Sequence, residues 1–259
     1  MNKSVSALWG REKGSVMKPT KKAAEMSVKE LARYIDQSVL KPEFTVDEIK
    51  KYTQEGIDFG CATICINPAS LPIVAPMVEG TDTGICIVCD FPFGLATTEA
   101  KAMLAEEYCS KWKIQDLDIV ANYGWLRSGL HDKVVEDLRP VVEVCHKYGT
   151  EVKVIIETET LTDEQIADGT RCAVEAGADF IKSSTGFVTG FESEGASPRV
   201  VKLMMDAANG EIKVKGSGCI RTREHFHELI DMGIDRMGVG FRSTPVVLDC
   251  TPEEAKNLA

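Results

Sequence analysis

The chain has 259 residues, of which 44% are hydrophobic and 27% charged, as expected of a globular protein with a sizeable core. Its net charge of −10 argues against nucleic-acid binding, which needs a basic face. No apolar run approaches the roughly 20 residues that span a bilayer, so we expect no membrane association. Residues 1–26 lack the apolar core of a secretory signal. We expect them to form a short, partly helical and flexible extension, and we expect a cytoplasmic protein.

Short apolar runs alternate with amphipathic stretches along the rest of the chain. The first helical stretch begins at Thr45, where Glu48 three residues later completes a capping box, and is expected to end at Gly56. Four further helical patterns cover residues 97–112, 131–149, 162–177 and 222–233. The predicted strands are residues 32–38, 60–66, 84–90, 116–122, 151–157, 178–184, 211–217 and 235–240.

This alternation predicts the fold class. Eight strands interleaved with helices in about 250 residues indicate one α/β domain, a (β/α)8 TIM barrel, over residues 27–259. The competing architecture is a doubly wound open sheet, but no G-x-G-x-x-G motif follows the first strand. Active sites of such barrels lie at the carboxyl ends of the strands. Polar residues at predicted strand ends are Asp36, Asn67, Asp90, Asp118, Asn122, Glu157, Lys182 and Lys215, with Gly238 beside them.

Two of these strand-end residues are lysines on neighbouring strands, Lys182 and Lys215, each followed by small residues. Two ammonium groups in one partly desolvated cavity disfavour each other's protonation, and a neutral amine can attack a carbonyl to form a Schiff base. Asp118 would then transfer protons. A single strand-end lysine is more often a solvated rim residue, and Lys213, at a strand start, receives that interpretation.

The nine cysteines mostly occupy apolar contexts. Cys86 and Cys89 have CxxC spacing, but no second pair and no nearby histidine completes four zinc ligands. We therefore predict buried free thiols and no metal site. Cys65, at the end of a predicted strand, is a candidate reactive thiol.

Five segments in consistent order resemble the deoxyribose-phosphate aldolase family, over about residues 30 to 245. They are "IDQSVLKP", "DLDIVANYGWLRSG", "VKVIIETETLTDEQI", "GADFIKSSTGF" and "KVKGSGCIRT". The resemblance implies a class I aldolase without metal or cofactor that cleaves 2-deoxyribose 5-phosphate to acetaldehyde and glyceraldehyde 3-phosphate. It assigns the Schiff base to Lys182, a supporting role to Lys215 and the proton relay to Asp118. Its partners would be a small-molecule aldehyde and a sugar phosphate, and a homodimer is common for such barrels.

The chain departs from the family pattern where the phosphate is expected. Cys219 follows Gly218 where the family has a second glycine, and "GVGFRST" at 238–244 replaces a serine-containing segment. We expect the phosphate to be held by backbone N–H groups and by a charge-assisted contact. The candidate binding residues are Gly186, Gly216, Gly218, Gly238, Gly240, Arg242 and Ser243, with Asp36 as a further substrate-site candidate. Two alternatives stay open: a related lysine aldolase with a different or unphosphorylated acceptor, and a non-catalytic barrel that binds a metabolite.

Overall fold

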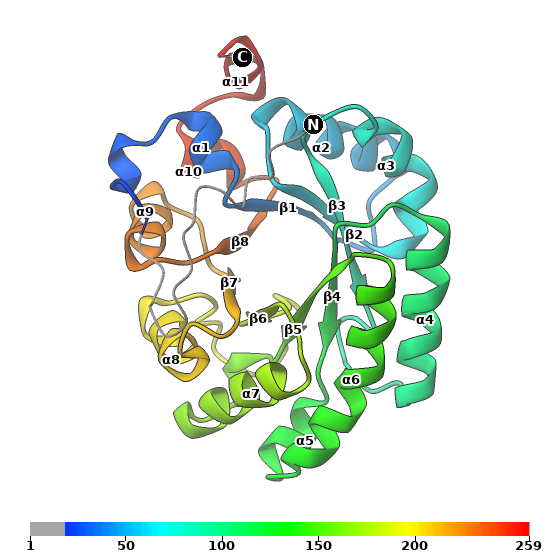
Figure 1. Cartoon of the computed structure of the whole chain (residues 1–259). Coiled ribbons are helices and arrows are strands. Elements are labelled where there is room, and N and C mark those ends of the chain that lie inside the picture. Colours follow the sequence, from blue (N-terminus) through cyan, green and yellow to red (C-terminus); the bar gives the residue numbers. More distant parts are fainter. Residues whose placement is uncertain (1–18, 259) are drawn as a thin grey trace.

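Residues 19–258 are described by the computed structural model, in which eight parallel strands close into a barrel in sequential order (Figure 1). The strands are β1 (Ile35–Val39), β2 (Thr63–Ile66), β3 (Gly84–Cys89), β4 (Asp116–Val120), β5 (Glu151–Ile155), β6 (Phe180–Lys182), β7 (Lys213–Ser217) and β8 (Arg236–Gly240). β8 closes the ring by pairing with β1, with Asp36 opposite Gly238. The predicted barrel is confirmed, and every predicted strand overlaps an observed one.

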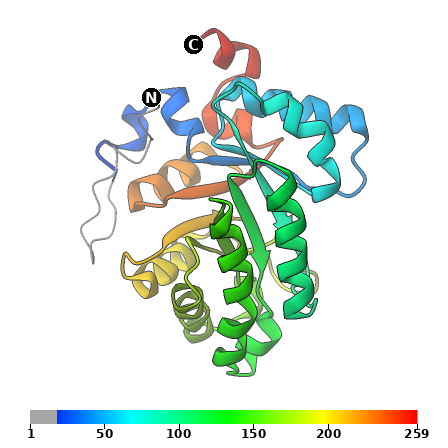
Figure 2. The ribbon, with the colours of Figure 1, turned by 45° about the vertical axis from the view of Figure 1, so that its right-hand side comes forward.

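Helices surround this barrel on its outer side (Figures 1 and 2). They are α1 (Val28–Ala32), α2 (Val46–Phe59), α3 (Leu71–Val78), α4 (Thr98–Lys111), α5 (Tyr123–Arg127), α6 (His131–Lys147), α7 (Asp163–Glu175), α8 (Pro198–Ala208), α9 (Arg223–Met232), α10 (Thr244–Leu248) and α11 (Pro252–Asn257). Short 3-10 turns occur at Ala23–Glu25, Pro68–Ser70 and Thr158–Thr160. Among the described helices, α3, α5, α8, α10 and α11 fall outside the five helical patterns predicted from the sequence, and so does α1, which follows the predicted extension.

The first large helix, α2, begins as predicted but ends later. Thr45 and Glu48 form the expected capping box, which is confirmed. The predicted end at Gly56 is wrong, because α2 continues to Phe59 and stops at Gly60 in the left-handed conformation, with φ of 77°. Gly56 instead allows close packing on the barrel, since a Cβ there would lie 2.4 Å from Cδ1 of Ile64.

Alternation along the strands separates two cores. Outward-facing residues such as Ile64, Leu117 and Val154 are fully buried against the helices in one large apolar layer. The inward-facing residues include charged side chains, together with a small apolar cluster of Leu40, Cys65, Cys86 and Val88. The interior of the barrel is therefore polar where the functional site was predicted.

The predicted extension at residues 1–26 lies outside the described residues up to residue 18. Within the described part, Ala23 is fully buried, and its backbone N–H donates to Oδ1 of Asp231 in α9 at 2.8 Å. The packed structure therefore includes residues that precede the predicted boundary at 27. None of the helices between residues 19 and 258 has both the length and the apolarity that crossing a bilayer requires.

Candidate active site

Seven charged side chains from six strands meet inside the barrel. They are the acidic residues Asp36, Asp116 and Asp118 and the basic residues Lys153, Lys182, Lys215 and Arg236. Six of them are 0–2% exposed, and the side chain of Arg236 is 13% exposed. Burial of this many charges is expensive unless each one is paired, and here each basic group contacts at least one carboxylate.

The structure brings the three predicted catalytic residues into direct contact. Lys182 and Lys215 are opposite each other in the register of β6 and β7. Both Nζ atoms donate to the same oxygen, Oδ2 of Asp118, at 2.8 Å from Lys182 and 2.7 Å from Lys215. The ammonium groups of both lysines therefore bind the same carboxylate oxygen of Asp118 at the carboxyl end of the barrel.

Three further charged residues lie deeper, and the sequence analysis gave them no role. Lys153 in β5 lies 3.3 Å from Oδ1 of Asp118 and also pairs with Asp116 in β4. Arg236 in β8 bridges Oδ1 of Asp36 at 2.7 Å and Oδ2 of Asp116 at 3.3 Å. The alternation of side chains along a strand could have identified Lys153 and Asp116, because both occupy inward-facing positions of their strands.

This network fixes the charge of its members. Burial alone would raise the pKa of Asp118, but the ammonium groups of Lys182, Lys215 and Lys153 outweigh it and hold that pKa well below its usual value. Burial alone would lower the pKa of Lys215, but the carboxylates of Asp118 and Asp36 raise it well above its usual value. Asp118 is therefore an anion and Lys215 a cation across the physiological pH range.

Lys182 is held less firmly than the other basic groups. It contacts one carboxylate, Asp118, whereas Lys215 contacts both Asp118 and Asp36, at 2.7 Å each. The seven side chains carry four positive and three negative charges when all are ionised, so release of one proton makes the cluster neutral. Among the four basic groups, Lys182 has the fewest carboxylate contacts.

The cysteines are free, as predicted, and seven are buried, while Cys219 and Cys250 are half-buried. The CxxC pair is split between the two sides of the strand. Cys86 belongs to the interior cluster with Cys65, whereas Cys89 packs in the outer core and its Sγ contacts the backbone oxygen of Lys101 at 3.9 Å. Residues three apart in a strand face opposite sides, so this pair cannot share one ion.

The candidate phosphate residues occupy different environments. A Cβ on Gly238 would lie 2.7 Å from Oγ of Ser217 and 3.6 Å from Cε of Lys215, so this glycine lets the two side chains pack closely against β8. Gly186 and Gly218 have positive φ, and Gly240 is exposed at the end of β8. Gly216 differs, because a Cβ there would lie 2.9 Å from side-chain atoms of Ala196 and Ile234. The missing side chain of Gly216 therefore allows close packing against the outer layer, and a contact of its backbone N–H with the phosphate stays a prediction.

Phe241 is turned toward α2 rather than toward the mouth. Its ring stacks on Tyr52 with centroids 3.8 Å apart and meets the edge of Phe44 at 5.4 Å. Arg242 is exposed, and its guanidinium lies 5.2 Å from the centre of the Phe241 ring. Ser243 is half-buried, and its N–H donates to the oxygen of Gly240 at 2.7 Å. Arg242 is therefore solvent-exposed, with its guanidinium beside the Phe241 ring.

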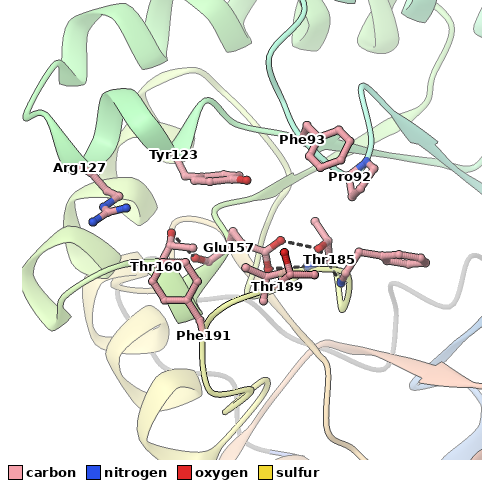
Figure 3. A pocket seen from close by; sticks show the side chains of 11 residues that line it. Pro92, Phe93, Tyr123, Arg127, Glu157, Thr160, Thr185, Thr189 and Phe191 are labelled. Carbon is pink, nitrogen blue, oxygen red and sulfur yellow. Dashed lines mark hydrogen bonds between the residues drawn. The ribbon is translucent and has the colours of Figure 1, made fainter.

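A pocket of about 150 Å³ is lined by residues that follow the carboxyl ends of β3 to β6 (Figure 3). Glu157 lies at its centre between Thr160 and Thr185, and its carboxylate accepts the backbone N–H of Thr185 at 2.9 Å (Figure 3). The remaining lining residues are Pro92, Phe93, Tyr123, Arg127, Phe187, Val188, Thr189 and Phe191. Phe187 packs edge-on against Phe91, which in turn packs on the interior cluster that contains Cys65 and Cys86, so this aromatic pair joins the pocket wall to the interior cluster.

A closed parallel barrel with two buried lysines and an aspartate in contact at the carboxyl ends of its strands is the arrangement of a barrel enzyme. Comparison with known proteins agrees with this class. A family model described as "DeoC/LacD family aldolase" matches residues 30–243, and the chain belongs to this family. It is 40% identical over 213 residues to a deoxyribose-phosphate aldolase of Clostridium kluyveri, covering 82% of this chain and 95% of that protein.

Solved structures give the same result. A putative deoxyribose-phosphate aldolase from Coccidioides immitis is 31% identical and superposes with a TM-score of 0.79, covering 86% of each chain. The deoxyribose phosphate aldolase from Aeropyrum pernix is 27% identical with a TM-score of 0.76, covering 86% of this chain and 91% of that one. The fold and the family therefore rest on similarity over most of the chain.

Proposed function

We propose that the protein is a class I aldolase that cleaves 2-deoxyribose 5-phosphate to acetaldehyde and glyceraldehyde 3-phosphate through a Schiff base on Lys182. The observation that carries this proposal is the shared contact of Lys182 and Lys215 with one oxygen of Asp118. A binding module would have no need of a second buried lysine beside the first. The names of the relatives supply the substrate.

In the proposed reaction, the neutral amine of Lys182 attacks C1 of the open-chain sugar, and loss of water gives a protonated imine. A base then removes the proton from the C3 hydroxyl. The C2–C3 bond breaks, its electron pair moves toward the imine nitrogen, and glyceraldehyde 3-phosphate leaves as an aldehyde. Protonation of the enamine at C2 and hydrolysis release acetaldehyde and restore the lysine. Asp118, directly or through a water molecule, is the proposed proton carrier.

Reductive trapping tests the assignment of Lys182. Incubation with acetaldehyde and borohydride should add the donor's mass to the peptide that contains Lys182. Lys182→Arg should remove both label and turnover while the protein stays folded, because arginine stays protonated and cannot attack a carbonyl. Lys213→Arg is the matched control and should label as the wild type does. Label confined to other lysines would refute the assignment.

A second candidate function is cleavage or synthesis with a different or unphosphorylated acceptor. It is favoured by the environment of β8, where Gly240 and Phe241 bring no hydroxyl to the mouth and Phe241 faces α2. Under the first proposal, backbone N–H groups near Gly186, Gly218, Gly238 and Gly240, with Arg242 and Ser243, hold the phosphate. Rates with 2-deoxyribose 5-phosphate and with 2-deoxyribose separate the two, since equal rates would favour the second.

We also propose that the enzyme acts in the cytoplasm as a homo-oligomer. A sugar phosphate as substrate supports the location. The Aeropyrum pernix relative is described as tetrameric, which supports self-association, and we expect a dimer or a higher assembly of this chain. Sedimentation analysis of the purified protein measures the state, and a monomer at all concentrations would contradict the proposal.

A further inference from the structure

Cys65 and Cys86 form a dithiol inside the barrel that the proposed reaction does not use. They are opposite each other in the register of β2 and β3, and both are at most 1% exposed. Their sulfur atoms and a carboxylate oxygen of Asp118 all lie within 4.8 Å of one another. Three adjacent strands thus direct two sulfur donors and one oxygen donor at the same point.

The spacing of these donors is close to that of a tetrahedral zinc site. Zinc binds thiolate sulfur at about 2.3 Å and carboxylate oxygen at about 2.0–2.2 Å, so a sulfur and an oxygen on one ion lie about 3.5 Å apart. In the structure, Sγ of Cys86 donates to Oδ1 of Asp118 at 3.1 Å. An ion in place of the thiol proton would require movements of a few tenths of an ångström there.

Exchange of two thiol protons for a divalent ion leaves the net charge of the site unchanged. Lys182 and Lys215 both contact Oδ2 of Asp118. The other oxygen, Oδ1, accepts the thiol of Cys86 and lies near the ammonium group of Lys153. When a divalent cation binds two thiolates, two thiol protons leave and the net charge of the interior cluster does not change.

We propose that Cys65, Cys86 and Asp118 bind a soft divalent cation such as Zn²⁺, and that this ion inhibits the aldolase. Binding forms two metal–sulfur bonds and one metal–oxygen bond, releases two protons and involves no change of oxidation state. The inhibition rests on the proposed function, because an Asp118 oxygen bound to a cation cannot accept a proton. A dication beside Lys182 also disfavours the protonated imine. The ion is an inhibitor in this proposal, not a cofactor.

The alternative donor set in the described residues, Asp36, Cys86 and Asp116, is less suited to such an ion. It offers one sulfur, and thiolate donors are what select soft metals. Its two carboxylates are bridged by the guanidinium of Arg236, at 2.7 Å from Asp36 and 3.3 Å from Asp116. The first set is therefore the one that the proposal uses.

A Cd²⁺ titration tests the site without using catalysis, because bound thiolates give an ultraviolet charge-transfer absorption. Cys65→Ser keeps the shape of the side chain and removes one thiolate. Even changes outside the ligand shell cost about 10–100-fold in metal affinity, so loss of a ligand should cost at least as much. Cys109→Ser is the matched control, because Cys109 and Cys145 are a second buried, hydrogen-bonded thiol pair. Cys86→Ser repeats the test at the neighbouring ligand.

We expect wild type and Cys109→Ser to share a Cd²⁺ absorption that Cys65→Ser and Cys86→Ser lose, with all four proteins folded by circular dichroism. Zn²⁺ should inhibit wild type reversibly, with restoration by a chelator, and inhibit Cys65→Ser at least tenfold less effectively relative to its own metal-free rate. Equal Cd²⁺ affinity in wild type and Cys65→Ser would overturn the site. Equal Zn²⁺ sensitivity of the two would overturn the inhibition. A protein without aldolase activity would still give the absorption, so failure of the proposed function is distinguishable.

Discussion

Replacing Lys215 with methionine tests whether its charge keeps Lys182 reactive. Both ammonium groups contact Oδ2 of Asp118, at 2.7 and 2.8 Å, which places the two nitrogens about 4 to 5 Å apart. At that separation and an effective dielectric constant of about 20, two like charges repel by about 3 to 4 kcal/mol. Since 1.36 kcal/mol corresponds to one pH unit, the acidic limb of the pH–rate profile should move by about two to three units.

The direction of this movement follows from the sign of the removed charge. Removal of a positive charge beside a reacting amine favours its protonated form, so the limb that reports the neutral amine is expected at a higher pH. The limb of kcat/KM for cleavage of 2-deoxyribose 5-phosphate should move upward, and the maximal rate should fall. Lys213→Met is the matched control, since Lys213 lies two residues earlier on β7 and pairs with Glu151 outside the cluster. If the acidic limb of the Lys215→Met profile stays at its wild-type pH, the proposed effect of the Lys215 charge is refuted.

Three other changes have defined outcomes. Asp118→Asn should lower kcat by about 10²–10⁴-fold, while borohydride still labels Lys182. Near-normal turnover would contradict proton transfer by Asp118 and make Asp36 the candidate. Arg242→Ala should raise KM for the phosphorylated substrate about ten- to a hundredfold but not for 2-deoxyribose, and equal effects on both would exclude a phosphate contact. Lys101→Met removes the buried partner of Asp137 in α6 and should cost about 3–5 kcal/mol of unfolding free energy in chemical denaturation. An unchanged midpoint would mean that water replaces the ammonium group.

Local patterns were sufficient for most of the architecture. The strands followed from short apolar runs, and α2 followed from its capping box. By contrast, α3 has the sequence LPIVAPMV, with no polar residue to create a helical period and with Pro76 inside it. The amphipathic α8 begins beyond the long connection after β6. Its apolar residues recur with a helical period, but the sequence analysis assigned no helix there.

The candidate site was predictable in its outer part only. Strand ends and alternation placed Lys182, Lys215 and Asp118 on inward-facing positions, and the structure brings them together. The role of Arg236 was not predictable, because its partners come from β1 and β4, up to 200 residues away in the chain. The orientation of Phe241 likewise depends on Tyr52, far away in sequence, and no local pattern encodes that contact.

The pairing of β8 with β1 has a consequence for synthesis of the chain on the ribosome. Asp36 emerges early with β1, but its partners Lys215 and Arg236 belong to the last two strands. Until those strands leave the exit tunnel, the carboxylate has no guanidinium or ammonium from them to neutralise it, and it must stay hydrated. The interior of the barrel therefore cannot dry before translation is nearly complete, and closure is a late, long-range event. An arrested nascent chain that ends before β8 should accordingly remain open to proteases, even though most of its helices have already been made.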